Sequence, residues 1–529
     1  MLPNTLIPGP HHETRWICAV QTPQTLRQCG NLNFIEDLRE ACGHIFVGAE
    51  RGYNLNSEDR PLRILQHPMP SGPLELPDQW IRDQFLILYA DAPAPIPYVV
   101  ECVRRPNGML RSLVANSLVK EIEEIPESIG IVHLQGDSST AIDFGGNLLC
   151  TPPLRSDHGA QQIIVSGKGS SLLSSLGIKP SQNNLLIDTS WLAVGHVDEV
   201  VSFAPSRSSD SDVLTLLASS PLARKLLEKS TETQRSTPLM RGKWICGERD
   251  YFDHYCELPA NRLLSNLEKE ESGQGYSDFQ NAIKYLRDTL GSFRSAMLEI
   301  PVLFLTPDSD EIPKTTSPNR IGLESALPNL VNIEYVTRRN AVHALLPRVF
   351  GPRVPKAEAE EILHGILKEL GYDCNVQHED ASGWQSFWGS PGESIERIPF
   401  YFCPLQEGPI REEFRALLKA GSIPKRLNLN SEDRNYFDKI VSSLATQLSD
   451  DEVMDGKLTR WKKLMIPDPA ECVYVDLFES YMQSVLGAHG LIPWFLDTWE
   501  YHARGGGLHC GTNQMREIPS YAVEAKDAA

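Results

Sequence analysis

Short apolar runs that alternate with longer amphipathic runs are the feature that most limits what this chain can fold into. The short runs have the length and apolar content of buried strands, and the longer runs repeat apolar residues at helical spacing. Strands that alternate with helices along a chain indicate a mixed α/β fold. The predicted strands are HIFVG (44–48), FLILYA (85–90), GIVHL (130–134), QIIVSG (162–167) and VLTLLA (213–218), and the predicted helices are FIEDLREACG (34–43), NRLLSNLEKE (261–270) and DFQNAIKYLRDTLGSFRSAML (278–298).

The composition is that of a globular protein, because 41% of the 529 residues are apolar. The chain is long enough for one large domain or several ordinary ones. Its apolar runs are too short to cross a membrane, and its first residues, MLPNTLIPGPHHETRW, lack the features of a signal peptide. The net charge of −19 argues against a nucleic-acid partner, although an acidic surface can attract cationic partners.

The 11 cysteines are scattered along the chain and include no C-x-x-C pair. An odd number of cysteines without a regular framework suits a reducing compartment better than a disulfide scaffold. A structural zinc site would need closely spaced ligands, which this pattern does not offer. We therefore predict a cytoplasmic protein with reduced thiols and no structural zinc.

The sequence pattern divides the chain into an irregular segment (1–30), a region of α/β alternation (31–515) and a tail (516–529). A tract at about 355–470 interrupts the alternation with amphipathic helices and with loops rich in aromatic residues, Pro and Gly. We interpret this tract as a mainly helical insertion. Its predicted helices are AEAEEILHGILKELGYDC (357–374) and SEDRNYFDKIVSSLATQL (431–448).

The heptapeptide NLNSEDR occurs twice, at 54–60 and at 428–434. Asn, Ser and Asp favour turns and helix starts, and the two contexts share little else. We interpret the repetition as a turn-and-cap signal rather than as a repeated structural unit.

His196 and Asp198 lie two residues apart in WLAVGHVDEVVSF (191–203). Side chains at positions i and i+2 of a strand point to the same face, so both would project into one pocket. The alternative is a half-buried strand with a hydrogen-bonded histidine and a surface Asp. An isolated H-x-D pattern favours that alternative.

Two other stretches combine residue types of catalytic sites with Trp or Gly. In PDQWIRDQF (77–85), Asp83 follows Trp80 by three residues, and the alternative is a turn or cap Asp before a strand. In RGGGLHCGTN (504–513), Cys510 follows three glycines, which let a backbone approach a ligand closely. The alternative for Cys510 is a buried structural thiol.

Together the three stretches are more specific than any one of them. Cys510, His196, Asp83 and Asp198 form a set that can attack a planar cationic carbon. Such a site needs carboxylates to hold the cation, a thiolate to add to it and an acid to protonate the departing nitrogen. A cysteine protease also needs Cys and His, but it does not need two acids for a cation.

The same stretches resemble, in order, the catalytic domain of the protein-arginine deiminases. The resemblance implies a five-bladed α/β propeller of the pentein fold, with the active site at the central pore and the 355–470 insertion between blades. It also implies that the two β-sandwich domains of animal members are absent. The matching stretches are DQWIRDQFLILYADAP (78–93), DFGGNLLCTPP (143–153), WLAVGHVDEVVSF, VLTLLASSP (213–221), PNLVN (328–332), DLFESYMQSVLGAHGLIP (476–493) and RGGGLHCGTN.

The resemblance assigns a role to each residue of the set. Cys510 matches the nucleophile, His196 the general acid/base, and Asp83 and Asp198 the carboxylates that clasp the guanidinium. The implied reaction forms a covalent thiouronium on the cysteine with loss of ammonia, and water then releases citrulline.

Further residues are implied as substrate contacts. Trp80 is expected to pack on the methylene stem of the substrate arginine, with Val194 in the apolar surroundings of the H-x-D motif. Arg105 falls near the family's arginine that reads the peptide backbone, and Asn107 stands at the second such position. Arg504 matches an arginine at the pore entrance.

Calcium organises the active cleft of animal members through acidic and amide ligands, and this sequence departs from them there. Arg82, Gln84, Leu86 and Leu149 stand where Gln and three Glu residues would be, and Cys102 replaces another acid. Calcium needs several hard oxygen ligands, which Leu and Arg do not supply. We therefore expect no cofactor and a calcium-independent enzyme in which Arg82 supplies the cation's charge internally.

The expected function is a protein-arginine deiminase, a hydrolase that acts on C–N bonds in linear amidines. One alternative is a deiminase of small guanidines such as free arginine or agmatine. Another is a catalytically inactive propeller that serves as an interaction module. The expected partners are arginine-containing proteins or peptides and a second copy in a homodimer, with neither nucleic acid nor membrane.

Overall fold

A computed structural model shows the fold of the protein. The residues that it describes are 5–23, 30–47, 61–67, 78–90, 96–102, 131–134, 141–156, 159–178, 184–206, 211, 213–234, 238–240, 244–245, 254–255, 258–293, 295–306, 322–372 and 474–517.

Five sheets in the described part of the chain repeat one strand pattern. In each, a middle strand pairs antiparallel with one neighbour and parallel with the other. The five sheets are β26 (Thr512–Glu517), β2 (Glu13–Gln21) and β3 (Leu62–Gln66); β4 (Phe85–Ala90), β5 (Ile96–Glu101) and β6 (Ile131–His133), with β1 (Thr5–Leu6) added to β4; β7 (Leu148–Cys150), β10 (Ile164–Gly167) and β11 (Asn184–Ile187); β12 (Val201–Pro205), β13 (Val213–Ser219) and β18 (Ser295–Pro301); and β21 (Glu334–Arg338), β22 (Ala341–Pro347) and β25 (Leu491–Leu496).

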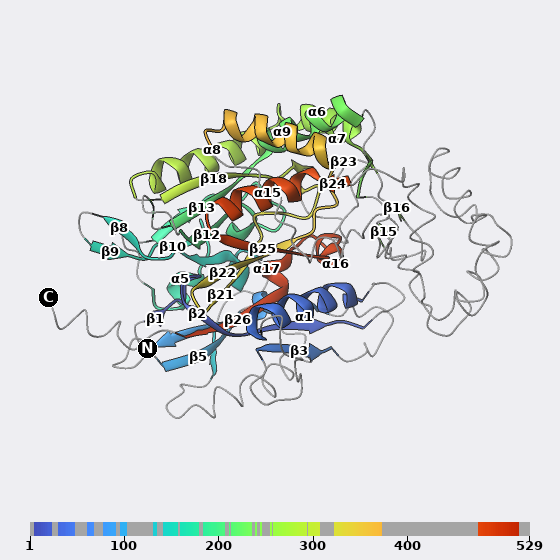
Figure 1. The fold of residues 1–529 in the computed structure, drawn as a ribbon. Helices are drawn as coiled ribbons and strands as arrows, with labels where there is room; N and C mark the ends of the chain where they lie inside the picture. The colour runs from blue at the N-terminus through green and yellow to red at the C-terminus, as the bar shows by residue number, and fades with distance from the viewer. Residues whose placement is uncertain are drawn as a thin grey trace, which may run out of the picture.

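In four of the five sheets, helices lie in the connection between the two parallel strands, because a parallel pair needs a crossover that a tight turn cannot provide; the connection from β5 to β6 lies outside the described residues. Figure 1 shows α6 to α9 gathered along one side of the molecule and α1 on the opposite side. The crossover helices are α1 (Leu32–Val47) after β2, α5 (Leu172–Ser175) after β10, α6 (Ser220–Gln234), α7 (Ala260–Glu270) and α8 (Gln274–Leu290) after β13, and α9 (Lys356–Glu369) and α15 (Leu477–Ala488) after β22.

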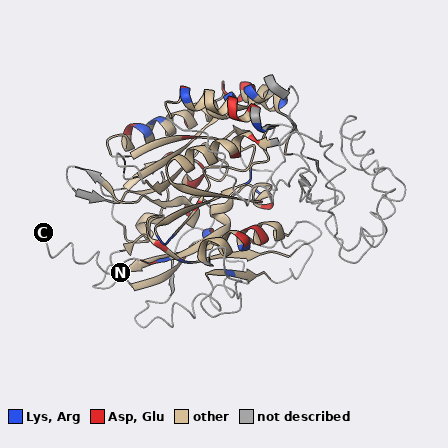
Figure 2. Ribbon diagram, in the orientation of Figure 1, with Lys and Arg blue, Asp and Glu red and all other residues tan. Residues whose placement is uncertain are grey.

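Apolar residues of the repeated sheets and their helices make the core. Every residue of β13 and of β4 is buried, as expected for strands covered on both faces. Figure 2 shows charged residues along the outer helices α6 to α9 and on α1 at the opposite side. Smaller antiparallel pairs complete the fold: β8 (Leu154–Ser156) with β9 (Gly159–Gln161), β14 (Pro238–Leu239) with β17 (Leu258–Pro259), β15 (Trp244–Ile245) with β16 (His254–Tyr255), and β19 (Phe304–Leu305) with β20 (Glu324–Ser325).

Within the described residues, none of the helices combines the length and the apolar content that a bilayer crossing requires.

The expected insertion connects two strands of the same sheet, rather than the last strand of one repeated sheet to the first strand of the next. It forms part of the crossover from β22 to β25, which are parallel neighbours. The antiparallel pair of β23 (Arg353–Pro355) and β24 (Tyr474–Asp476) joins the two ends of the segment at its base. The first predicted helix of the tract is confirmed as α9, whereas the second, at 431–448, and both copies of NLNSEDR lie outside the described residues.

Three local predictions were wrong. The segment 1–30 is not simply irregular, because its residues Glu13–Gln21 form the middle strand of a sheet that also contains β26, near the other end of the chain. HIFVG continues α1 instead of forming a strand, and it places Ile45 and Phe46 in the same core as Phe34. The long helix predicted at 278–298 ends at Leu290, and a strand, β18, begins at Ser295.

Candidate active site

Five short segments meet at a single site, and each leads into the strand that pairs antiparallel with the middle strand of one repeated sheet. Each makes one tight turn and then becomes extended, so a polar side chain is placed at the end of the sheet. The segments are α2 (Ile81–Gln84) before β4, the 3-10 turn Gly145–Asn147 before β7, the 3-10 turn Val197–Glu199 before β12, residues 329–332 before β21, and α17 (Leu508–Gly511) before β26.

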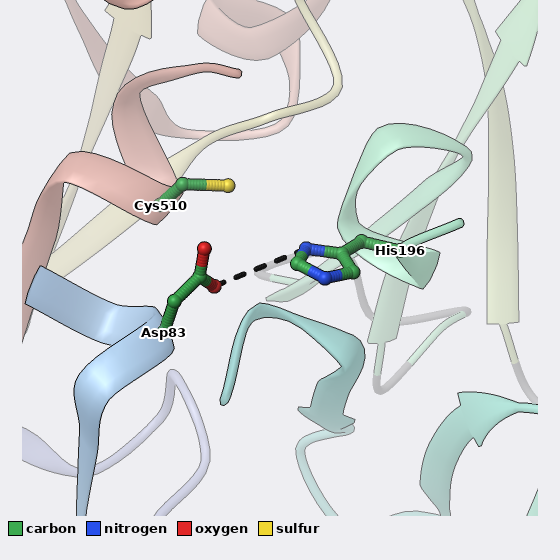
Figure 3. A group of neighbouring side chains, drawn as sticks. All are labelled: Asp83, His196 and Cys510. Carbon is green, nitrogen blue, oxygen red and sulfur yellow. Dashed lines mark ion pairs between the residues drawn. The ribbon is translucent and has the colours of Figure 1, made fainter. Parts of the chain in front are cut away.

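Three of these segments bring Asp83, His196 and Cys510 together. One carboxylate oxygen, one ring nitrogen and the thiol sulfur lie within 4.8 Å of one another. Figure 3 shows the three side chains pointing toward a common centre, with His196 Nδ1 at 3.9 Å from Asp83 Oδ1. All three residues are buried, so their interactions are only weakly screened by solvent.

Asp198 is the fourth predicted residue, and the structure brings it to the same place. Its Oδ2 accepts hydrogen bonds from the Cys510 thiol at 3.4 Å and from His509 Nδ1 at 2.8 Å. Its Oδ1 is buried and has no hydrogen-bond partner among the described residues. An unpartnered buried carboxylate oxygen is costly unless a ligand completes it, so Asp198 Oδ1 is an acceptor prepared for a donor.

The strand that we predicted for His196 and Asp198 was wrong. The segment is not a strand: His196 is extended, and Val197–Glu199 form a 3-10 turn. The two side chains therefore do not share a strand face. They reach the site because the turn directs His196 toward Asp83 and Asp198 toward Cys510.

Burial and the nearby carboxylates together favour the neutral thiol of Cys510. Burial raises the pKa of Cys510 well above its ordinary value, and the negative charges of Asp198, Asp83 and Glu199 raise it further. Burial also acts to raise the pKa of Asp198, but its hydrogen bond to His509 and the charges of His509 and His196 outweigh burial and lower it. The free site therefore holds a neutral thiol beside an ionised carboxylate.

A sequence model described as protein-arginine deiminase matches residues 73–396 of this chain. This chain belongs to the protein-arginine deiminase family. The matched region contains Trp80, Asp83, His196 and Asp198, whereas Cys510 lies beyond it. The contacts of Cys510 with Asp198 therefore join it to the family's matched residues independently of that match.

Among curated relatives of the family, the chain is 25% identical over 344 residues to protein-arginine deiminase type-4 of Rattus norvegicus. It is 26% identical over 349 residues to type-3 of Mus musculus. Both alignments cover 61% of this chain and 47% of the relative, so the chain spans about half the length of the curated relatives it matches. A solved C. jejuni agmatine deiminase overlaps 69% of this chain and 87% of its own at 11% identity, with a TM-score of 0.31, which is too low to support an argument.

Three of the expected substrate contacts lie among the described residues. Trp80 is buried at the edge of the site, with its ring 5.5 Å from that of Tyr501. The guanidinium of Arg504 lies 5.9 Å from the centroid of the Trp80 ring. Val194 is half-buried, and Arg105 and Asn107 lie outside the described residues.

The positions of the family's calcium ligands do not fit calcium in this chain. Arg82 places a guanidinium there, and its Nη2 pairs with Glu334. Leu86 is buried, and Leu149 is half-buried. Burial and nearby acids raise the pKa of the Cys102 thiol, which keeps it neutral. A cation and apolar side chains supply none of the oxygen ligands that calcium needs.

The side chain of Gln84 is held by a contact within the chain. Its side-chain amide donates to Asp78 at 2.7 Å. In the described part of the chain, the group of His, Cys, Asp and Glu side chains close enough to hold a metal is Asp83, His196 and Cys510. That group has a single carboxylate, which is a poor match for a hard cation.

Close packing explains the glycines around the site at two positions. A Cβ added at Gly506 would lie 2.3 Å from the ring of Trp80. A Cβ added at Gly146 would lie 2.7 Å from His196 Nδ1 and 2.9 Å from Asp83 Oδ1. Both positions therefore admit only glycine without displacing a site residue.

Sequence reasoning missed three residues that hold the site. His509 donates its backbone N–H to Asn332 Oδ1 at 2.7 Å while its ring binds Asp198. The amide of Asn332 also reaches the carbonyl of Asp198 at 3.4 Å and the sulfur of Cys510 at 3.9 Å. Asn332 lies in PNLVN and His509 in RGGGLHCGTN, but the sequence pattern assigned neither residue a role. Glu334, the third, contacts Arg82 and Thr512, and no local pattern marked it.

Proposed function

We propose that this protein hydrolyses the guanidinium group of arginine residues in proteins or peptides to citrulline, with release of ammonia. One observation carries the proposal: the thiol of Cys510 lies beside the carboxylates of Asp83 and Asp198. Asp198 Oδ1 has no hydrogen-bond partner among the described residues, so it can accept from a bound cation. Membership of the protein-arginine deiminase family supports it.

Binding would begin with the two carboxylates. A guanidinium is planar, remains protonated at any usable pH and offers five N–H donors. Asp83 and Asp198 can accept from it through charge-assisted hydrogen bonds, which are stronger than neutral ones. The bound cation also offsets the negative charges that keep the Cys510 thiol protonated, so substrate binding itself favours the thiolate.

The chemistry then needs one sulfur and one proton carrier. His196, whose ring nitrogen is within 4.8 Å of the sulfur, takes the thiol proton as sulfur bonds to the guanidinium carbon. His196 returns that proton to an amino nitrogen of the tetrahedral adduct. The C–N bond breaks, ammonia leaves and a thiouronium remains on Cys510.

Hydrolysis would reverse the proton route. Water adds to the thiouronium carbon as His196 removes its proton. The C–S bond then breaks, which leaves the ureido group of citrulline and the free cysteine. One proton of the water returns to the sulfur of Cys510, and the other passes from His196 to solvent, where it converts the released ammonia to ammonium.

We propose that the five repeated sheets are the blades of a closed propeller around this site. Their common strand pattern supports the proposal, as does the pairing of β26 with β2, which joins strands from the two ends of the chain. The meeting of five blade-leading turns at one point is what a central pore would require.

The peptide specificity rests on the site's outer edge. Arg504, beside Trp80, offers guanidinium donors that suit the carbonyl oxygens of a peptide. Arginine-containing proteins or peptides are the partners that we propose. The cysteines that the structure describes are free thiols, which fits a reducing compartment such as the cytoplasm.

We also propose that the activity needs no calcium, because Arg82, at a position where the resemblance implies a calcium ligand, places a guanidinium that pairs with Glu334. Full activity in excess chelator is the expected result, and a requirement for millimolar calcium would contradict it.

The test compares three substrates: a blocked arginine amide, free arginine and agmatine. We expect citrulline and ammonia in equal amounts from the blocked amide, at a higher kcat/KM than from either small guanidine. A higher kcat/KM for free arginine or agmatine would replace the protein substrate by a small one. Absence of ammonia from all three would overturn the deiminase proposal.

A further inference from the structure

A second polar cluster lies behind the turn that carries Cys510, in a cavity of about 90 Å³. His509 lines this cavity while its ring also bonds Asp198, whereas Cys510 and the other three predicted residues are absent from the lining. The turn therefore separates this cavity, which we call the rear chamber, from the candidate active site. The polar lining residues of the rear chamber are Arg82, Ser202, Glu334, Tyr335, His509, Asn513, Gln514 and Arg516.

Arg82 holds the turn from the rear chamber. Its Nε donates to the carbonyl oxygens of His509 at 2.9 Å and of Thr512 at 3.2 Å, the residues on either side of Cys510 and Gly511. Its Nη2 pairs with Glu334, and only 12% of the side chain is exposed. A planar guanidinium can serve two carbonyls and a carboxylate at once because its donors are fixed in a fork.

Glu334 contacts the residues that follow the turn through their side chains. Its Oε2 accepts from Thr512 Oγ1 at 3.0 Å, and its Oε1 accepts from the side-chain amide of Gln514. Both residues lie in β26, two and four positions after Cys510. The end of the turn is therefore fastened through its carbonyls to Arg82 and through its side chains to Glu334.

The charges of the rear chamber disfavour a metal ion. Two guanidiniums, Arg82 and Arg516, face one carboxylate, Glu334, which lies 3.8 Å from Arg516. Burial lowers the pKa of Arg516 to about 10, so it remains charged at neutral pH. The sum is one positive charge, which repels a divalent cation, and the apolar lining from Leu86 and Leu149 adds no ligand.

We infer that Arg82 and Glu334 form a built-in clamp that positions the Cys510 turn against Asp83 and Asp198 without a metal ion. The inference rests on the proposed function, since it concerns where the nucleophile sits. Both are positioning residues, because neither belongs to the cluster around the sulfur. Loss of the clamp displaces the sulfur but leaves the substrate's carboxylates in place, so kcat falls while KM changes little.

The test compares Arg82→Gln with Arg516→Gln. Arg516 is a matched control, because it is also buried beside Glu334 but donates to the carbonyls of His12 and Tyr335 rather than to the turn. We expect kcat to fall about 10²-fold in Arg82→Gln, the cost of a misplacement of about 1 Å. In Arg516→Gln we expect kcat to stay within about threefold.

Hydrogen exchange gives a readout that does not depend on turnover. Faster amide exchange in the peptide that covers 507–513 is expected for Arg82→Gln and not for Arg516→Gln. If the Gln variant does not fold, Arg82→Lys provides the test, because an ammonium keeps the charge but loses the fork; the expected loss of kcat is then smaller but in the same direction.

Equal losses of kcat and equal exchange in the Arg82 and Arg516 variants would overturn the clamp. A loss confined to KM in Arg82→Gln would do the same. A wild-type protein that releases no ammonia would refute the proposed function alone, and the exchange contrast would still decide whether Arg82 orders the turn.

Discussion

The two sides of the Leu508–Gly511 turn differ in whether their carboxylates are paired with cationic side chains of the protein. On the front, Asp83 and Asp198 surround a thiol, and one oxygen of Asp198 has no partner among the described residues. On the back, the carboxylate of Glu334 is paired with Arg82 and lies near Arg516. The front is prepared for a cation from outside, whereas the back already contains its own cations. One turn can therefore be held firmly on one side and remain reactive on the other.

The largest effect should come from the front of the turn. Cys510→Ser keeps the shape of the side chain but removes the thiolate that we propose as the nucleophile. We expect ammonia release to fall about 10⁴-fold or more. The thermal midpoint should stay close to that of the wild type, and a variant that keeps its activity would exclude Cys510 as the nucleophile.

A carboxylate of the front should matter nearly as much. Asp198→Asn removes the charge that would receive the guanidinium. The loss of two charge-assisted hydrogen bonds, worth about 1.5–3 kcal/mol each, should lower kcat/KM about 10³-fold. Asp188→Asn is a matched control, because the side chain of Asp188 also accepts hydrogen bonds, from Ser190 in an exposed turn. Equal effects of the two substitutions on kcat/KM would remove Asp198 from the site.

The pH dependence of the reactivity of the Cys510 thiol tests the electrostatic role of Asp198. The pKa of Cys510 in the free protein is raised, so alkylation of Cys510 by iodoacetamide should keep accelerating as the pH rises past 9. Removal of the negative charge in Asp198→Asn lowers that pKa, and the alkylation curve should shift to lower pH. Peptide mass spectrometry measures the modification of Cys510, with buried Cys42 as the internal reference. A shift in the opposite direction would contradict the electrostatic role of Asp198.

A substitution at the back of the turn should lower the stability of the protein more than it changes KM. Glu334→Gln leaves two buried guanidiniums without their carboxylate, and breaking a buried pair costs about 3–5 kcal/mol. We expect the thermal midpoint to drop by several degrees, with a smaller change in KM than Asp198→Asn produces. Differential scanning calorimetry and steady-state kinetics measure the two quantities, and a stable variant with a large increase in KM would reverse the roles of front and back.

The sequence alone was sufficient for the mixed α/β class, and it singled out four residues that the structure brings together, because their motifs match one family in order along the chain. Structure was needed to show how they meet. The H-x-D motif forms a 3-10 turn rather than a strand, since its neighbours must lead into β12 at the end of a sheet. No short-range pattern could reveal that choice.

Contacts across long sequence separations account for what the sequence could not predict. The strand Glu13–Gln21 pairs with Thr512–Glu517, and Thr14 bonds to Gln514 at 3.0 Å. Glu334 is distant in sequence from both Arg82 and Thr512, and it contacts both only in the folded chain. The clamp behind Cys510 therefore became visible only in three dimensions.

The most direct measurement of the account is the mass of the protein quenched with acid during turnover of a blocked arginine amide in excess chelator. We predict an adduct equal to the substrate minus ammonia on the peptide that contains Cys510, absent from Cys510→Ser. Turnover without an adduct in any quench, or an adduct on another cysteine, would contradict the account.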